Sequence, residues 1–99
     1  MKLTIIREDG SVYKDGLAFS DLDLSDMPSN VHALQWDNES GWIEFVNESE
    51  FRKPSNQDIL ELPYWAEVAL VKWQSAKDAH DAANAIDAPQ ATVSGAQMF

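Results

Sequence analysis

The chain contains no cysteine among its 99 residues. This absence excludes a disulfide framework, a thiolate metal site and a cysteine nucleophile, and it leaves the redox compartment open. No apolar run approaches the ~20 residues of a membrane span. The apolar stretch at the N-terminus is too short for a signal peptide and is followed at once by charged residues. We therefore expect a cytosolic protein with no membrane partner.

Positive charge is also scarce, because 7 lysines and arginines stand against 17 aspartates and glutamates, for a formal net charge of −10. A surface of this sign repels nucleic acids and anionic membranes. Direct binding of nucleic acid is therefore not expected. Two interpretations of the acidic surface stay open. It serves solubility, or it imitates DNA by spaced carboxylates.

Catalytic and metal-binding patterns are missing as well. The only two histidines, His32 and His80, lie far apart in the chain and form no zinc set. We expect His32 to be a packed strand residue, and we expect His80 not to face its neighbour Asp81 on a helix. Residues 21–26 alternate aspartate with leucine like the start of a calcium loop, but the required glycine and bidentate glutamate are absent. The sequence predicts no enzyme, cofactor or metal site.

Residues 31–45 are the most informative stretch for the fold. Two runs of aromatic and aliphatic residues flank a polar segment, residues 37–41, which predicts a β-hairpin with a loop of about five residues. Alternation with a period of two places His32, Leu34 and Trp36 on one face of the first strand. A hairpin of this kind predicts a sheet with one apolar face.

The segment before the hairpin predicts further short strands. Residues 2–8 are apolar on both faces, which is typical of a central or covered strand. Asp-Gly pairs at residues 9–10 and 15–16 predict tight turns on either side of a short second strand. These signals together predict a small antiparallel β-meander of about four to five short strands.

The C-terminal half predicts a long helix. Asn56 is a candidate N-cap for a first helical turn over residues 59–62, and Pro63 suits the start of a longer helix that runs to about Ile86. An apolar stripe should pack this helix on the sheet; its members are Trp65, Ala66, Ala69, Leu70, Trp73 and Ala76. The predicted class is α+β, with one domain over residues 1–86 (sheet 1–46, helix about 56–86) and a flexible tail over residues 87–99.

Surface aromatic and small residues are the candidates for partner binding. Four tryptophans are many for 99 residues, and alternation points Trp36 and Trp42 to opposite faces of the hairpin. Each is either buried or a protein-binding anchor. Small residues at helical spacing in the distal helix would allow a neighbouring chain to approach, or they only stabilise the helix end. The candidate residues are Tyr13, Trp36, Trp42, Tyr64, Ala76, Ala79, Ala83 and Ile86.

Residues 11–16 (SVYKDG), 31–36 (VHALQW), 41–45 (GWIEF) and 56–66 carry a family resemblance. The chain resembles, over about residues 1–75, small proteins of tailed bacteriophages encoded beside tail-fibre and other tail genes. The resemblance implies no catalytic residue. It implies a tail-fibre assembly factor or minor virion component that binds a phage structural protein in the host cytoplasm or in the virion. The small-residue spacing of the distal helix, and not the resemblance, is what would allow a homo-oligomer there. The alternative is an acidic DNA-mimic inhibitor of a host defence or DNA-binding protein.

Overall fold

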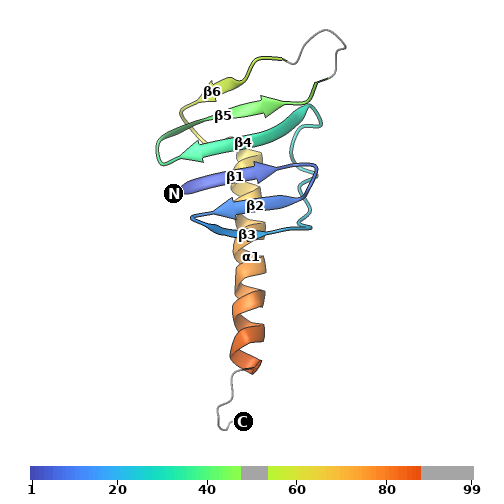
Figure 1. Ribbon diagram of the computed structural model, residues 1–99, viewed down its shortest axis with the longest axis vertical. Coiled ribbons are helices and arrows are strands. Elements are labelled where there is room, and N and C mark those ends of the chain that lie inside the picture. Colours follow the sequence, from blue (N-terminus) through green and yellow to red (C-terminus); the bar gives the residue numbers. More distant parts are fainter. Residues whose placement is uncertain (48–53, 88–99) are drawn as a thin grey trace.

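The computed structural model describes residues 1–47 and 54–87, with side chains up to Asn84. A six-stranded sheet forms one layer and a single helix forms the other (Figure 1). The predicted α+β class is therefore confirmed, with more strands than predicted. The elements are β1 (Lys2–Ile6), β2 (Ser11–Lys14), β3 (Leu17–Phe19), β4 (Val31–Asp37), β5 (Ser40–Phe45), β6 (Gln57–Ile59) and α1 (Tyr64–Asp87).

The strand order is β3-β2-β1-β4-β5-β6, and every neighbouring pair is antiparallel. The sheet thus consists of two three-stranded meanders joined by the pairing of β1 with β4, instead of one continuous meander. Leu3 and Ile5 of β1 are 2% and 0% exposed. The prediction of a central, covered first strand is confirmed.

The tight turns occur at residues that tolerate a left-handed backbone conformation. Asp15 and Gly16 have φ values of 49° and 88° and connect β2 to β3, as the Asp-Gly signal predicts. In the next hairpin Asp37 pairs with Ser40, so only Asn38 and one further residue form the loop. The predicted loop of about five residues is wrong, because Asn38 adopts a φ of 62° and closes a tight turn.

A β-bulge lies near the start of β4. The register between β4 and β5 shifts between Val31 and Ala33, so His32 is the extra residue and the alternation is reset across it. Val31 is consequently 3% exposed and belongs to the core. The prediction that His32 shares a face with Leu34 and Trp36 is wrong for this reason, and the His32 side chain remains 38% exposed.

Residues 57–59 form strand β6. The predicted helical turn over residues 59–62 is wrong, because Ile59 ends this strand and residues 60–63 are not helical. The residues of β6 pair with β5, whose backbone groups would otherwise be unpaired at the sheet edge. The sheet therefore extends beyond residue 46, and Asn56 caps no helix. The helix begins at Tyr64, and the carbonyl of Pro63 accepts hydrogen bonds from the amides of Ala66 (3.0 Å) and Glu67 (3.3 Å). Pro63 is thus the N-cap residue, and the first helical residue is Tyr64 instead of the predicted Pro63.

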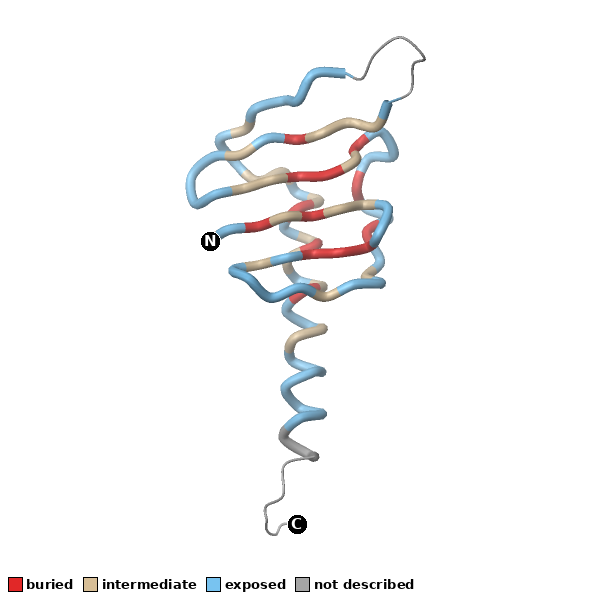
Figure 2. Tube along the Cα trace, in the orientation of Figure 1, coloured by how far each residue is buried: buried red, intermediate tan, exposed pale blue. Residues whose placement is uncertain are grey.

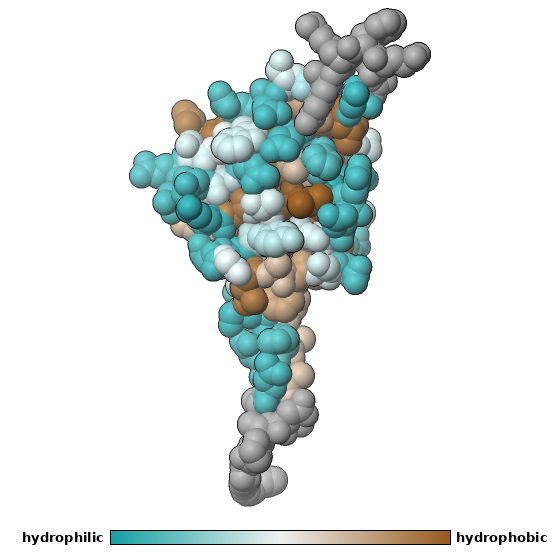
Figure 3. All heavy atoms as spheres, viewed as in Figure 1, coloured by the Kyte–Doolittle hydropathy of each residue, from teal (hydrophilic) through white to brown (hydrophobic). Residues whose placement is uncertain are grey.

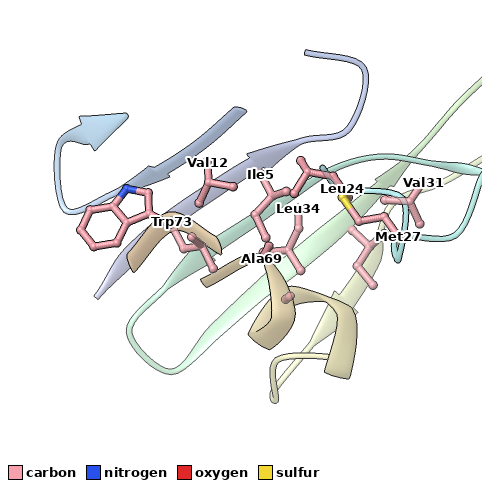
Figure 4. Packing of buried hydrophobic residues seen from close by; sticks show 11 residues of the cluster. Ile5, Val12, Leu24, Met27, Val31, Leu34, Ala69 and Trp73 are labelled. Carbon is pink, nitrogen blue, oxygen red and sulfur yellow. The ribbon is translucent and has the colours of Figure 1, made fainter. Parts of the chain in front are cut away.

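The core lies between the sheet and α1 (Figures 2 and 4). Ile5 and Leu34 from the two central strands are completely buried against Ala66 and Ala69 of the helix, which are 0% and 1% exposed. Alanine at these positions lets the helix backbone approach the sheet closely. The predicted sheet-facing stripe of α1 is confirmed by its burial, which includes Trp73 at 5% exposure.

The connection from β3 to β4, residues 20–30, covers one side of this core. Leu24 and Met27 are buried, and the ammonium group of Lys72 on α1 donates a hydrogen bond to the carbonyl of Asp23 and lies 3.5 Å from Oδ2 of Asp26. The alternating acids and leucines therefore give this segment one wet side and one dry side, as an edge segment requires.

Trp73 connects the helix to the edge of the sheet. Its indole Nε1 donates a hydrogen bond to the carbonyl of Leu17 at 2.9 Å. The ring meets Phe19 edge-on at 5.9 Å, and Nζ of Lys14 lies 4.8 Å from its centroid. Beyond this point α1 extends past β3 without cover from the sheet (Figure 1). The predicted tail begins at residue 87, and its residues 88–99 lie outside the described residues.

Candidate functional site

The face of the sheet that points away from α1 carries a row of side chains that the strand register aligns. Tyr13 pairs with Thr4, Thr4 with Gln35, and Gln35 with Trp42. Because directly paired residues project to the same face of a sheet, these four residues form one row across β2, β1, β4 and β5. We call it the open-face row. It brings together two of the aromatic residues that were predicted to bind a partner.

The two aromatic residues are at the ends of the open-face row and are partly exposed, Tyr13 by 46% and Trp42 by 41%. With adjacent strands about 4.8 Å apart, the three strand intervals between them separate their backbones by roughly 14 Å. Figure 3 views the molecule from this side and shows pale and brown side chains among hydrophilic ones over the sheet.

Hydrogen bonds hold the polar members of this face in place. Thr4 Oγ1 donates to Gln35 Oε1 at 2.7 Å, and both residues are only partly exposed. Trp42 Nε1 donates to Glu44 Oε2 at 2.9 Å. The first bond fixes the centre of the face, and the second fixes the orientation of the indole ring. The indole N–H therefore already has a hydrogen-bond acceptor when another protein covers the ring.

A shallow hollow of about 480 Å³ lies beside Trp42, at the corner where β5 meets β6. Its lining combines Trp42 and the 80% exposed Leu60 with the carboxylates of Asp37 and Asp58. A lining that combines apolar side chains with two carboxylates suits a small apolar or basic side chain of a partner. Sequence reasoning missed Leu60, because it assigned that residue to a helical turn.

The other predicted aromatic residues are elsewhere. Trp36 pairs with Gly41 and faces the helix, where it is half-buried against the core. The prediction that Trp36 and Trp42 point to opposite faces is confirmed, and Trp36 is no part of the open face. Tyr64 is 77% exposed, but it belongs to α1, which packs on the opposite side of the sheet.

The predicted small residues of the distal helix do not form one uniform surface. Ala76 is half-buried, whereas Ala79 and Ala83 are exposed. Ile86 lies within the helix, but its side chain is outside the described residues. These alanines follow one flank of α1 instead of its fully outward side, because Ala76 lies beside the buried Trp73 stripe.

Each histidine lies at the surface within 4.0 Å of one acidic group among the residues that the structure describes. His32 Nδ1 lies 4.0 Å from Glu8 Oε2, and His80 Nδ1 lies 3.7 Å from Asp81 Oδ1. The prediction that His80 and Asp81 do not face each other is wrong, because the imidazole ring reaches sideways to the neighbouring carboxylate. Lys77 also bonds Asp81 at 2.6 Å and holds the pKa of that carboxyl below its ordinary value. In 1–47 and 54–84, no three potential ligands gather as a metal site would require.

The acidic segment over residues 21–26 has a structural explanation. The hydroxyl and the backbone amide of Ser25 hydrogen-bond to the carboxylate of Asp23 and lower its pKa, and the Lys72 charge lowers it further. Asp23 thus stabilises a turn through Ser25, and Asp26 forms an ion pair with Lys72.

Comparison with known protein families, with curated proteins and with solved structures finds no match for this chain. In the part of the chain that the structure describes, no helix has the length and apolar character needed to cross a membrane.

Proposed function

We propose that this protein is a non-enzymatic binding protein that attaches to another protein through the open face of its sheet. One observation carries the proposal: Tyr13 and Trp42, both more than two-fifths exposed, end a single row on a face that no element among residues 1–47 and 54–87 covers. Tyrosine and tryptophan supply much of the binding energy in protein interfaces, because each buries a large rigid area.

The polar groups between these two aromatics support the proposal. Thr4 already donates a hydrogen bond to the side-chain oxygen of Gln35, so a partner that covers these residues leaves fewer polar groups unpaired than it would over two unbonded side chains. The hollow beside Trp42, which Leu60 also lines, adds a place for one projecting side chain. A flat centre with a neighbouring hollow is a surface that a folded partner protein can cover.

The partner that we propose is a structural protein of a tailed phage, with the tail fibre as first candidate. The sequence resemblance described above supports this assignment. In this role the protein assists tail-fibre assembly or enters the virion as a minor component, and it works in the host cytoplasm. No catalytic step and no cofactor belong to the proposal.

The distribution of the acidic side chains supports a role in solubility more than an imitation of DNA. A DNA mimic needs one continuous acidic face. Here Glu8 and Asp9 lie in the turn at one end of β1, whereas Asp37 and Glu39 lie at the opposite end of the strands. Asp81 is distant from both, on the projecting part of α1. We therefore keep DNA mimicry outside the proposal.

Co-expression with the neighbouring tail-fibre protein tests the proposal. The wild-type protein should co-purify with the fibre and raise the yield of soluble, trimeric fibre. Trp42→Ala should weaken binding by at least about 30-fold in Kd, since truncation of an aromatic anchor that the partner buries costs about 2 kcal/mol or more. Isothermal titration calorimetry on the purified pair measures this change.

Two tyrosines provide a matched comparison. Tyr13→Ala should weaken binding to the fibre, whereas Tyr64→Ala, which removes an equally large exposed ring on the other side of the molecule, should not. Absence of co-purification together with unchanged fibre solubility would overturn the phage assignment. Equal binding by wild type and by a variant lacking both open-face aromatics would overturn the assignment of the site.

A further inference from the structure

The hollow beside Trp42 carries negative charge that the monomer leaves unpaired. Its lining includes the carboxylates of Asp37 and Asp58, and both residues are exposed. In the part of the chain that the structure describes, neither carboxylate forms an ion pair or a hydrogen bond. Glu44 differs from them, because its carboxylate accepts a hydrogen bond from the indole N–H of Trp42.

The positive groups at the same end of the sheet do not neutralise this hollow. Lys2 pairs with Asp37 in the register of β1 and β4, so the two residues project to the same face. The Lys2 ammonium group nevertheless forms no ion pair with any carboxylate in 1–47 and 54–84. The N-terminal ammonium group donates instead to Oδ1 of Asn38. Both carboxylates of the hollow are therefore available to a cation from a partner.

Strand pairing places the two carboxylates on either side of the Trp42 ring. Asp58 of β6 is the direct partner of Trp42, and directly paired residues project to the same face. Asp37 of β4 pairs with Ser40, two residues before Trp42 on β5, so it shares that face as well. The two acidic residues are thus two strand intervals apart, roughly 10 Å across the sheet, with the tryptophan strand between them.

This arrangement has the chemistry that recognises an arginine side chain. A guanidinium group is planar and stacks on an aromatic ring, while its N–H groups donate to carboxylates beside the ring. The hydrogen bond from Trp42 to Glu44 orients the ring before binding, which lowers the entropy cost of the contact. Leu60, 80% exposed in the lining, offers apolar surface to the aliphatic stem of the arginine. A lysine ammonium group is more strongly hydrated and gains less from the ring.

We propose that the hollow beside Trp42 receives an arginine side chain of the partner protein. The inference rests on the binding function proposed for the open face, and it names the side chain that this corner of the face recognises. The formal charge of −10 attracts a basic region of a partner over a longer distance, and added salt should weaken the attraction.

NMR titration of the full chain with the peptide acetyl-Gly-Arg-Gly-amide tests the hollow by itself. We expect a Kd of roughly millimolar order for a single side chain, with the largest shifts at the indole N–H of Trp42 and the backbone amide of Leu60. Peptides with uncharged citrulline or leucine in place of arginine should bind at least about 5-fold more weakly, and a lysine peptide at least about 2-fold. Equal affinity for arginine and any of these three, or no shift at either residue, would overturn the proposal.

Charge-removing variants test the two carboxylates. Asp58→Asn should weaken binding of the arginine peptide about 3-fold, and the double variant with Asp37→Asn about 10-fold. Glu67→Gln is the matched control, because it removes the same charge from an exposed position on α1, and it should leave the Kd unchanged. Circular dichroism should show the same fold for all variants. A double variant that binds the arginine peptide as tightly as wild type would contradict the assignment.

The tail-fibre protein distinguishes this inference from the proposed function. If Trp42→Ala weakens fibre binding but the double aspartate variant binds the fibre like wild type, the open face remains the binding site and the arginine assignment is overturned. If the arginine peptide binds in the hollow but the fibre does not co-purify, the arginine assignment is supported and the phage partner is overturned.

Discussion

Replacement of Trp73 by alanine should remove much of the stability of this domain. The side chain is 5% exposed, and truncation of a buried tryptophan costs about 3–5 kcal/mol through lost burial and the cavity that remains. The hydrogen bond to the carbonyl of Leu17, the edge contact with Phe19 and the cation–π contact with Lys14 are all lost with the ring. We expect a loss near 5 kcal/mol, at the upper end of that range of about 3–5 kcal/mol.

This loss is large compared with the stability of a domain of this size. At about 0.05–0.15 kcal/mol per residue, a chain of this length has roughly 5–15 kcal/mol in total. The alanine variant should therefore unfold at a much lower urea concentration or be largely unfolded in buffer. Trp73→Phe retains most of the ring but loses the indole hydrogen bond, so it should cost only about 1–2 kcal/mol.

Urea unfolding followed by far-ultraviolet circular dichroism measures these free energies. Val71→Ala is the control, because that side chain is 66% exposed on the same helix and should change stability by no more than about 0.5 kcal/mol. A loss below about 1.5 kcal/mol for Trp73→Ala would refute the claim that this residue holds α1 on the sheet. If Trp73→Ala and Trp73→Phe lost the same unfolding free energy, the claim that ring packing contributes more than the indole hydrogen bond would be refuted.

Two further predictions concern the hairpin turn and the distal helix. A Cβ atom at Gly41 would lie 2.0 Å from the backbone oxygen of Gln35, so Gly41→Ala should cost about 3 kcal/mol in urea unfolding. Gly16→Ala, with φ +88° but open space, should cost only about 1–2 kcal/mol; equal losses would contradict the steric argument. Lys77 lowers the pKa of Asp81 by a hydrogen bond, so its contribution to stability is present above the ordinary pKa of 3.8 and is lost as pH falls through the lowered value. NMR titration should find this pKa below 3.8 and nearer to it in Lys77→Gln; no difference between the two proteins would contradict the pairing.

Local signals in the sequence predicted a large part of the fold correctly. The Asp-Gly pairs at residues 9–10 and 15–16 predicted turns, and the alternation around Trp36 and Trp42 placed these rings on opposite faces. The periodic stripe ending at Trp73 predicted the helix face that packs on the sheet. Each of these signals depends on the geometry of a few consecutive residues, so the sequence alone contains it.

The errors occurred where distant residues determine the local structure. Residues 57–59 have no strong strand pattern, and they form β6 because the edge of β5 offers unpaired backbone groups. The bulge at His32 depends on the register with β5. For the same reason, the exposed position of Leu60 beside Trp42 was not predicted.

The sequence by itself determined the class of this protein: a cysteine-free, acidic α+β domain with a central hairpin and one amphipathic helix. Only the tertiary structure decided that β4 pairs with β1, and this pairing places Tyr13 and Trp42 in one row. It also decided which side of α1 remains free. The physical reason is that periodicity assigns side chains to faces within one element, whereas pairing between elements depends on the burial and hydrogen bonding of the whole chain.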